Sequence, residues 1–465
     1  MAKKVIDMTV GSPFKNIILF AIPIALGFML QNLYSLGDVL IVSHSLNANA
    51  ATGVNLTGSI TFLVLGFSAG LSSGFGIVLS QYVGAKDAVN MRKSVATTIC
   101  LSVIISITVA VIATVLSSWM LKLLDTPDEF INYSDIYLKA IFIGLPCTMM
   151  YNVSSEILRA MGDSRTPLIT LILCAIINIG LNSLLFVAPS FTCAWAGWAT
   201  IISQAVSAAV GFIVIFKKFP ELKLSKDDFK FAPRFVGKHL LMGIPMSIQF
   251  VITASGCMVQ QQAINGLPAP APMAQANGSK IDNLFGMFLN GCGVAMATYC
   301  GQNYGAKKYD RIKKGFIAGF GAGAIFTVIS MCCNTFLAVP LSKILLPAYR
   351  MEGLPAGVTP DNVYDMIFTY NGTQSCFYYF LYLIFMSRQA LQGIGKSTIA
   401  LFGGVVEFFV RLIASPLLAN NFGFMGIVFS NPLAWIVGGL FLTIAFIICF
   451  VRLCKKANAK EFSSL

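Results

Sequence analysis

The sequence predicts an all-α polytopic membrane protein, with twelve transmembrane helices in two parallel six-helix repeats. Three observations support this prediction: the composition, a succession of long apolar segments, and short motifs that recur in the second half of the chain. Of the 465 residues, 56% are hydrophobic and only 11% are charged, and the mean hydropathy is +0.77. A soluble domain has about 25% charged residues, so lipid is the solvent that suits this surface.

Each predicted span has the length and the apolar character that a bilayer requires, which is about 20 residues for one helix. The first apolar run begins at Phe14. It is too long for a signal peptide and has no cleavage-like end, so we interpret it as a membrane helix. Prolines inside several spans are tolerated where neighbouring helices satisfy the freed backbone carbonyl. The expected spans are 14–43, 56–80, 95–121, 131–157, 166–187 and 195–216, then 239–265, 281–301, 314–338, 364–387, 398–418 and 426–451.

The basic residues orient these spans. Of the 32 Lys and Arg residues, 26 fall in segments on one side of the predicted topology, five fall on the other side, and Arg411 lies inside a span. Loops on the cytoplasmic side are rich in Lys and Arg. We therefore expect a plasma (cytoplasmic) membrane protein with both termini in the cytoplasm. Basic residues beside the membrane face anionic lipid headgroups, so the net charge of +13 does not indicate nucleic acid as a partner.

Four short motifs recur at nearly constant offset. The pairs are Ile22-Pro23 with Ile244-Pro245, Gln81–Lys86 with Gln302–Lys307, Gly162-Asp-Ser164 with Gly395-Lys-Ser397, and Gly197 with Gly426. Six spans is an even number, so both halves enter the membrane from the same side. We predict an N-terminal lobe over 1–216, a cytoplasmic linker over 217–238 and a C-terminal lobe over 239–465. Transporters with such repeats bind substrate between the halves and alternate access by rocking.

A series of motifs runs along nearly the whole chain. It comprises Asp38, Gln81–Lys86, Arg159-Ala-Met-Gly-Asp-Ser-Arg-Thr-Pro167, Asn178-Ile-Gly-Leu-Asn182, Trp198-Ala-Thr200 and Gln302-Asn-Tyr-Gly-Ala-Lys307. In this order and spacing the motifs resemble the MATE family (multidrug and toxic compound extrusion). The resemblance implies two six-helix lobes around a central cavity. It also implies export of diverse, often cationic organic compounds, driven by a gradient of H⁺ or Na⁺. We expect a bacterial protein that works as a monomer, without a cofactor.

Polar residues in the first lobe form a candidate coupling site. Asp38, Asn182 and Thr200 are predicted at about 9 Å depth in the outer leaflet, and Asn178 is predicted one helical turn deeper. An ionisable group in a membrane helix costs roughly 2.5–3.5 kcal/mol and is a functional candidate by default. These oxygen ligands suit a hard cation such as Na⁺, while Asp38 could instead carry a proton. The alternative is that they only hydrogen-bond between helices. Some MATE members place an ion site here, although the family commonly has Asp at position 182.

The second lobe has two further candidates. Glu407 and Arg411 are spaced i,i+4 in the eleventh span, the favourable order for an ion pair. They are interpreted as a neutralised pair, or else Glu407 has a role toward substrate or proton. Tyr378, Tyr379 and Tyr382 in the tenth span could line a substrate cavity and hold an organic cation by cation–π attraction, or simply pack inside the bundle.

Several other classes are disfavoured. No Walker A motif is present, so ATP does not power this chain alone. No converging set of catalytic side chains is visible, so an enzyme is not expected. A lipid-linked saccharide flippase is the main alternative, but such proteins tend to carry several intramembrane basic residues, and here only Arg411 qualifies. The seventh span has no carboxylate and the tenth has Asp365 only at its mouth, which favours coupling in the first lobe. Three prolines predict a non-helical outer link over 266–280.

Overall fold

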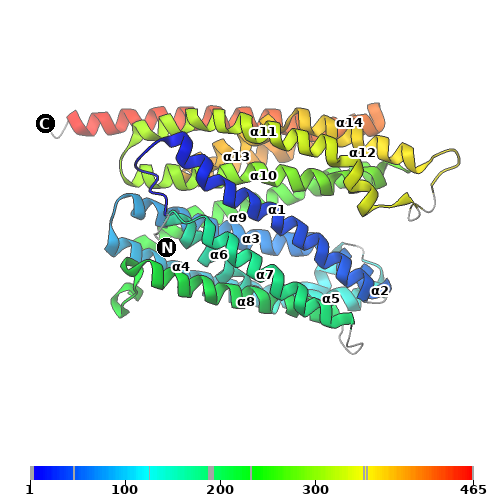
Figure 1. Cartoon of the computed structure of the whole chain (residues 1–465), viewed down its shortest axis with the longest axis horizontal. Coiled ribbons are helices and arrows are strands. Elements are labelled where there is room, and N and C mark those ends of the chain that lie inside the picture. The colour runs from blue at the N-terminus through cyan, green and yellow to red at the C-terminus, as the bar shows by residue number, and fades with distance from the viewer. Residues whose placement is uncertain are drawn as a thin grey trace. The chain divides into compact units, whose positions relative to one another are not determined.

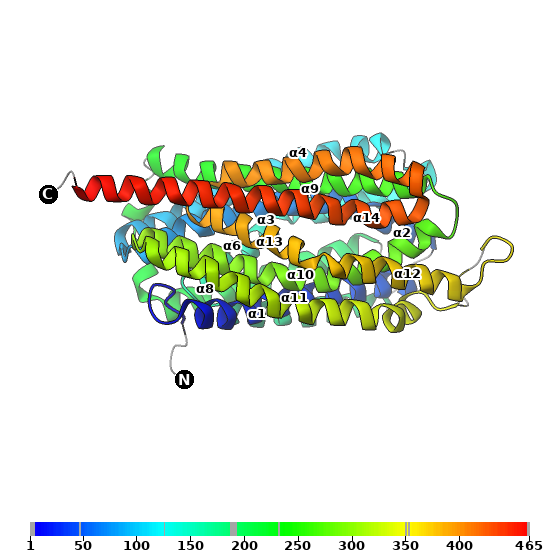
Figure 2. The ribbon, with the colours of Figure 1, turned by 90° about the horizontal axis from the view of Figure 1, so that it is seen from above.

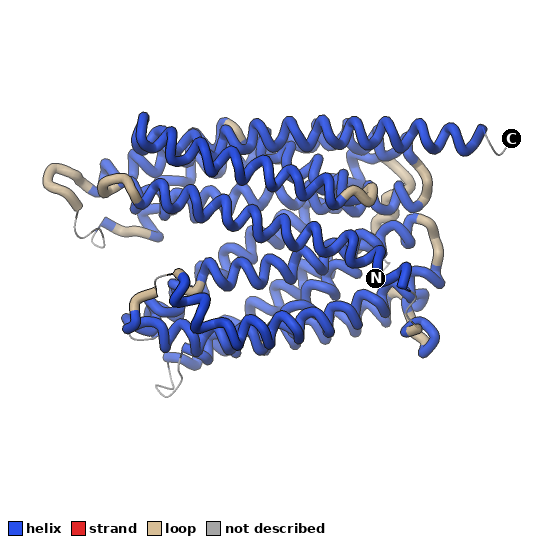
Figure 3. Tube along the Cα trace, turned by 180° about the vertical axis from the view of Figure 1, so that it is seen from behind, coloured by secondary structure: helices blue, strands red, loops and turns tan. Residues whose placement is uncertain are grey.

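The computed structural model describes residues 5–45, 48–124, 126–186, 193–230, 233–348, 351 and 354–462. For residues 35–40, 42–45, 48, 51 and 458–462 it describes the backbone alone. Helices account for nearly all of the described chain, and this part of the protein contains no strand (Figure 3). The all-α prediction is therefore confirmed.

The α-helices follow the expected spans closely. Three short 3₁₀ helices connect some of them, at Leu184–Phe186, Pro220–Leu222 and Lys226–Phe229. The α-helices, labelled in Figure 1, are α1 (Pro13–Ser45), α2 (Ala48–Leu56), α3 (Gly58–Gly84), α4 (Ala88–Leu123), α5 (Asp128–Ile143), α6 (Leu145–Ala160), α7 (Arg165–Ser183), α8 (Cys193–Lys218), α9 (Pro233–Asn265), α10 (Ala271–Gly305), α11 (Tyr309–Leu345), α12 (Pro360–Cys376), α13 (Tyr378–Gly393) and α14 (Ser397–Phe462).

Twelve spans can be traced through these helices. Nine of the helices in the described segments are long and apolar enough to cross a membrane, and α5 with α6 forms a tenth span bent by 48°. Helices α12 and α13 meet at Phe377 and form a broken eleventh span. Helix α14 has 66 residues with a non-helical Gly423 inside it. At 1.5 Å per residue it is about three times as long as the hydrocarbon core is thick, so its two halves are separate spans, side by side in Figure 2.

The chain packs into two compact units. The first unit contains residues up to Met8, residues 30–251 and residues 305–307, and the second unit contains 9–29, 252–304 and the chain from Lys308 onward. Helices α1 and α9 therefore each change unit along their length. The lobe limits of 1–216 and 239–465, which follow the sequence repeat, stay a prediction.

A stripe of small residues lets two helices of the first unit touch through their backbones. Gly66, Gly70 and Gly74 repeat every four residues on α3, and they face the first half of α9. A Cβ atom on Gly74 would lie 2.4 Å from the Cα atom of Gly243, and one on Gly70 would lie 2.7 Å from the carbonyl oxygen of Met246. Small residues at this spacing allow such close approach in membrane bundles.

Adding one methyl group to this contact should destabilise the protein. Gly74→Ala has no room, and overpacking of this kind costs about 1–3 kcal/mol. We expect a clearly lower melting temperature in detergent, measured by differential scanning fluorimetry. Gly180→Ala is the matched control, because a Cβ atom on Gly180 of α7 meets nothing within 4 Å. Equal melting temperatures for the two variants would contradict the close packing.

The second unit uses its own glycine stripe differently. A Cβ atom on Gly315 or Gly323 of α11 would overlap the rings of Tyr299 and Tyr382. Both of these tyrosines are fully buried. The stripe therefore provides holes for aromatic rings from α10 and α13 rather than a backbone contact.

The repeated motifs share an unusual backbone conformation. Lys86 and Lys307, the last residues of the matched motifs Gln81–Lys86 and Gln302–Lys307, have φ angles of +56° and +57°. Gly162 and Gly395, which open the matched motifs Gly162-Asp-Ser164 and Gly395-Lys-Ser397, have φ angles of +84° and +81°. A non-glycine residue with positive φ is uncommon, so its recurrence at matched positions supports the two repeats that the sequence predicts.

Candidate functional site

Three of the four predicted coupling residues come together in the first unit. The Asn178 Nδ2 atom on α7 donates to the Thr200 Oγ1 atom on α8 over 3.1 Å. The Asn182 Nδ2 atom donates to the Asn178 Oδ1 atom over 3.0 Å, one turn along the same helix. Both asparagine side chains are fully buried. The fourth residue, Asp38, lies on α1, and its side chain is outside the described residues.

This amide–hydroxyl chain has a definite hydrogen-bond direction. The Thr200 hydroxyl donates to the carbonyl oxygen of Ala196 over 3.1 Å and accepts from Asn178. Asn178 Oδ1 and Thr200 Oγ1 each have a second lone pair beyond the bond already formed. Oxygen atoms of this kind are the ligands that a hard cation prefers. The arrangement therefore serves equally as an interhelical contact and as neutral ligands beside a carboxylate.

The second unit contains a cluster of three buried charges, here called the arginine cluster: Arg388, Glu407 and Arg411. The predicted neighbours Glu407 and Arg411 approach to 3.7 Å between Oε2 and Nη1. The Arg388 Nη2 atom on α13 donates to Glu407 Oε1 and is the nearer partner. The Arg411 Nε atom donates to Asn431 Oδ1 over 3.0 Å. All three charged residues are at most 7% exposed.

Arg388 corrects the sequence-based assignment of charges. The expected tenth span ends at residue 387, so the sequence places Arg388 just outside it, among the 26 basic residues on the cytoplasmic side. The structure places it inside α13, which continues to Gly393, with its guanidinium turned to Glu407. Among the described residues of the second lobe, two basic side chains, Arg388 and Arg411, are therefore buried rather than one. Two guanidiniums on one carboxylate leave a net positive charge in the core of the unit.

Sequence reasoning missed a buried carboxyl group, Asp282. The prolines at 268, 270 and 272 predicted an outer link up to residue 280, which put Asp282 at the mouth of its span. The structure instead begins α10 at Ala271, because proline in the first helical turn loses no hydrogen bond. Asp282 therefore lies about 16 Å along the helix and is 8% exposed. The extra carboxylate also removes the argument that coupling groups occur only in the first lobe.

The side chain of Asp282 contacts neutral donors. The Tyr378 Oη atom donates to Asp282 Oδ1 over 2.9 Å, and the Asn334 Nδ2 atom on α11 approaches the same oxygen to 3.4 Å. A run of polar residues along the inner face of α12 and the start of α13 could have indicated this site. It comprises Asn371, Gln374, Ser375 and Tyr378.

The tyrosines predicted for a substrate cavity mostly point into the packed unit. Tyr378 and Tyr382 are fully buried. The Tyr382 Oη atom donates to the carbonyl oxygen of Gly319 over 2.6 Å. Tyr379 is half-buried, and its ring stacks on that of Tyr382 with centroids 6.1 Å apart. Their proposed contact with substrate stays a prediction.

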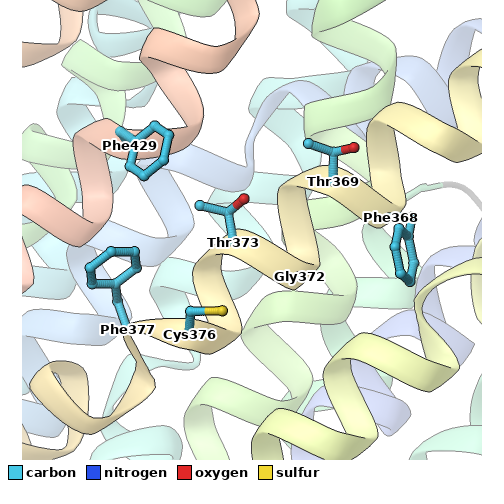
Figure 4. A pocket seen from close by; sticks show the side chains of 7 residues that line it. All are labelled: Phe368, Thr369, Gly372, Thr373, Cys376, Phe377 and Phe429. Atoms are coloured by element: carbon cyan, nitrogen blue, oxygen red, sulfur yellow. The ribbon is translucent and has the colours of Figure 1, made fainter.

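An open groove lies on the other face of α12, here called the α12 groove. Its cavity volume is about 510 Å³, and its lining residues, drawn in Figure 4, are Phe368, Thr369, Gly372, Thr373, Cys376, Phe377 and Phe429. The rings of Phe377 and Phe429 meet edge to face, with centroids 6.3 Å apart. Three phenylalanine rings and two threonine hydroxyl groups give this open groove the mixture of apolar and polar atoms that small organic ligands contact.

A charged turn joins α6 to α7. Asp163 accepts from the Lys218 Nζ atom and the Thr166 Oγ1 atom, each over 2.6 Å, and from the backbone N–H of Thr166 over 3.1 Å. Burial raises the pKa of the Asp163 carboxyl, but the hydrogen bonds from Lys218 and Thr166 outweigh it, so the pKa is lower than its ordinary value. Asp163 therefore caps the first turn of α7 and connects it to the end of α8.

This turn should make stability depend on pH. Removing one partner of a buried, charged hydrogen bond costs about 1–3 kcal/mol, so Asp163→Ala should melt at a lower temperature than wild type at pH 7. Because the folded pKa is lowered, the stabilisation is complete above the unfolded pKa of about 4 and is lost as pH falls below it. Melting curves between pH 7 and pH 3 should converge. A constant difference across this range would contradict the role of the carboxylate.

Two six-helix repeats with buried polar groups inside their helices define a membrane transporter of duplicated design. The MatE family model matches the chain twice, over residues 23–184 and 245–417. The chain therefore belongs to the MATE family, as its motifs suggested. Members of this family are transporters, so the protein is a multi-pass membrane transporter and not an enzyme.

Relatives and solved structures agree with this assignment. The probable multidrug resistance protein YoeA of Bacillus subtilis is 26% identical over 312 residues, which cover 65% of this chain and 67% of the relative. YpnP of the same organism, also a probable multidrug resistance protein, is 28% identical over 311 residues, covering 66% and 69%. An outward-facing multidrug resistance MATE family transporter superposes with a TM-score of 0.88 at 17% identity, covering 97% of this chain and 99% of its own. This likeness shows the fold.

Proposed function

We propose that the protein is a secondary active multidrug exporter. It exchanges amphipathic, often cationic organic compounds for H⁺ or Na⁺ by alternating access between its two repeats. The observation that carries the proposal is the match of the family model to both halves of the chain, together with relatives named as multidrug resistance proteins. The aromatic α12 groove gives the second unit a surface of suitable chemistry.

Coupling is proposed to involve the first unit. Asp38 would bind the exchanged proton or Na⁺, and Asn178, Asn182 and Thr200 would supply neutral oxygen ligands. The hydrogen-bonded geometry of the two asparagines and the threonine supports this assignment. The proposed topology puts both termini in the cytoplasm and the protein in the plasma membrane, where it works as a monomer.

Dye accumulation in cells tests the proposed export. Cells that express the protein should accumulate less ethidium than cells with the empty vector, and the difference should disappear when a protonophore and a sodium ionophore are added. Surface-exposed amounts of protein should be matched by immunoblot of the membrane fraction. Unchanged accumulation across a panel of cationic dyes would count against drug export and for transport of a different lipid-soluble substrate, such as a lipid-linked saccharide.

A further inference from the structure

We propose that Asp282 is a second proton-exchange site, located in the second unit, which releases its proton when an organic cation occupies the α12 groove. This inference rests on the proposed export function and adds to it a residue, an ion and a ligand surface. Three features of the second unit support it: an isolated carboxyl group, a shortage of hydrogen-bond donors around it, and a broken helix that separates it from the groove.

The first feature is the isolation of the carboxyl group. Across the described segments, Asp282 forms no salt bridge with Lys, Arg or His. The titratable groups that face it are Tyr378 from α13 and Tyr370 from α12, both neutral phenols, and α11 contributes the amide of Asn334. Burying a carboxylate without an opposite charge is unfavourable. The Asp282 carboxyl group is therefore expected to be protonated, and so neutral, in one state of the transport cycle.

The second feature is the shortage of donors. Asn334 directs its Nδ2 atom to acceptors only, at Asp282 Oδ1, at Ser375 Oγ over 2.9 Å and at the backbone oxygen of Asn371 over 3.2 Å. The Oδ1 atoms of Asn334 and Asn371 receive no hydrogen bond, although both side chains are fully buried. A protonated carboxyl group has one O–H donor. Protonation of Asp282 would therefore add a hydrogen-bond donor to a site that has too few.

The third feature is the position of the site on α12. Asn371 and Ser375 face the carboxyl site, while Thr373 and Cys376 on the opposite face of the same helix line the α12 groove. Helix α12 ends beside Phe377, which also lines the groove. The next residue is Tyr378, which donates to Asp282. A ligand that displaces the backbone at Phe377 also displaces the next residue, whose hydroxyl group contacts the carboxyl oxygen.

The ionised state also has support within the unit. Two neutral donors reach the Asp282 Oδ1 atom, from Tyr378 and from Asn334. The exchange is a simple dissociation: the O–H bond of the Asp282 carboxyl breaks, the electron pair stays on the carboxylate, and the proton goes to water as the cation binds.

Binding measurements on the purified full-length protein test this proposal. The probe is tetraphenylphosphonium, a permanently charged aromatic cation, and the readouts are its affinity as a function of pH and the proton release on binding in weakly buffered detergent solution. If one proton is exchanged, the affinity rises by up to about tenfold per pH unit. Asp282→Asn should flatten this dependence and remove the corresponding proton release.

Matched variants separate the role of Asp282 from folding and from the first unit. Asp365→Asn, at an exposed position of α12, should keep the wild-type pH profile. Asp38→Asn should keep the proton release that comes from Asp282. Tyr378→Phe should shift the pH profile without flattening it, and melting temperatures check the fold of each variant.

The possible results lead to different conclusions. A full pH dependence in folded Asp282→Asn, or an affinity that depends on Na⁺ and not on pH, would overturn the assignment of a proton to Asp282. Proton-coupled binding that is lost in Asp282→Asn, in a protein that exports no dye, would support the exchange site and contradict the proposed export. Dye export by wild type, together with an unchanged pH profile of binding in Asp282→Asn, would support the proposed export and contradict the exchange site.

Discussion

Glu407→Ala is expected to destabilise the second unit more than any other single substitution in the arginine cluster. The change removes the one carboxylate that both guanidiniums share, and leaves Arg388 and Arg411 as like charges in a buried environment. Both arginines are at most 7% exposed, and leaving a buried charge unpaired costs about 3–5 kcal/mol. The expected result is a strong loss of folded protein after detergent extraction, measured by size-exclusion chromatography and melting curves.

Combined variants test whether the three charges act as one unit. Arg411→Ala alone should be milder than Glu407→Ala, because Arg388 still contacts the carboxylate. Removing Glu407 together with Arg388 should cost less than the sum of the two single changes, because it removes opposite charges in contact. Strictly additive losses would mean that Glu407 and Arg388 do not stabilise each other.

Asp38→Asn is expected to abolish gradient-driven export while folding and substrate binding persist. The substitution preserves the size of the side chain and removes its ability to bind a proton or pair with a cation. Burial disfavours the charged form of a carboxyl group and a bound cation favours it, so a single aspartate can exchange ions as its surroundings change. Dye efflux from vesicles should fall to the level of empty vesicles, while binding of the dye to the purified variant stays close to wild type.

Asn182→Asp provides the complementary change. It adds a second carboxylate next to Asn178, to which Asn182 is hydrogen-bonded, and restores the residue that the family commonly has here. If Na⁺ is used, the dependence of export on Na⁺ should increase. Wild-type efflux rates in Asp38→Asn would remove the coupling role of Asp38.

The number of spans was predictable because it depends on local composition. Twelve apolar segments and the repeated motifs are visible in the sequence without any knowledge of packing. The spacing of Asn178 and Asn182 likewise predicts a shared helix face, and the structure confirms that the two side chains form a hydrogen bond.

Features that depend on packing were less predictable. Asp282 was misplaced because a proline-rich segment reads equally as a link or as the first turn of a helix. Arg388 was counted as cytoplasmic because nothing in the sequence shows that its side chain turns back to Glu407. That α1 and α9 each pack partly in one unit and partly in the other depends on tertiary contacts alone.

Reconstitution into proteoliposomes tests the central claim of ion-driven export most directly. The purified protein is placed in vesicles that contain quenched ethidium, and an inward gradient of H⁺ or of Na⁺ is imposed separately, with no gradient as the reference. The account predicts efflux against the ethidium gradient under at least one ion gradient, and none in its absence. Equal ethidium movement with and without both gradients would contradict secondary active transport.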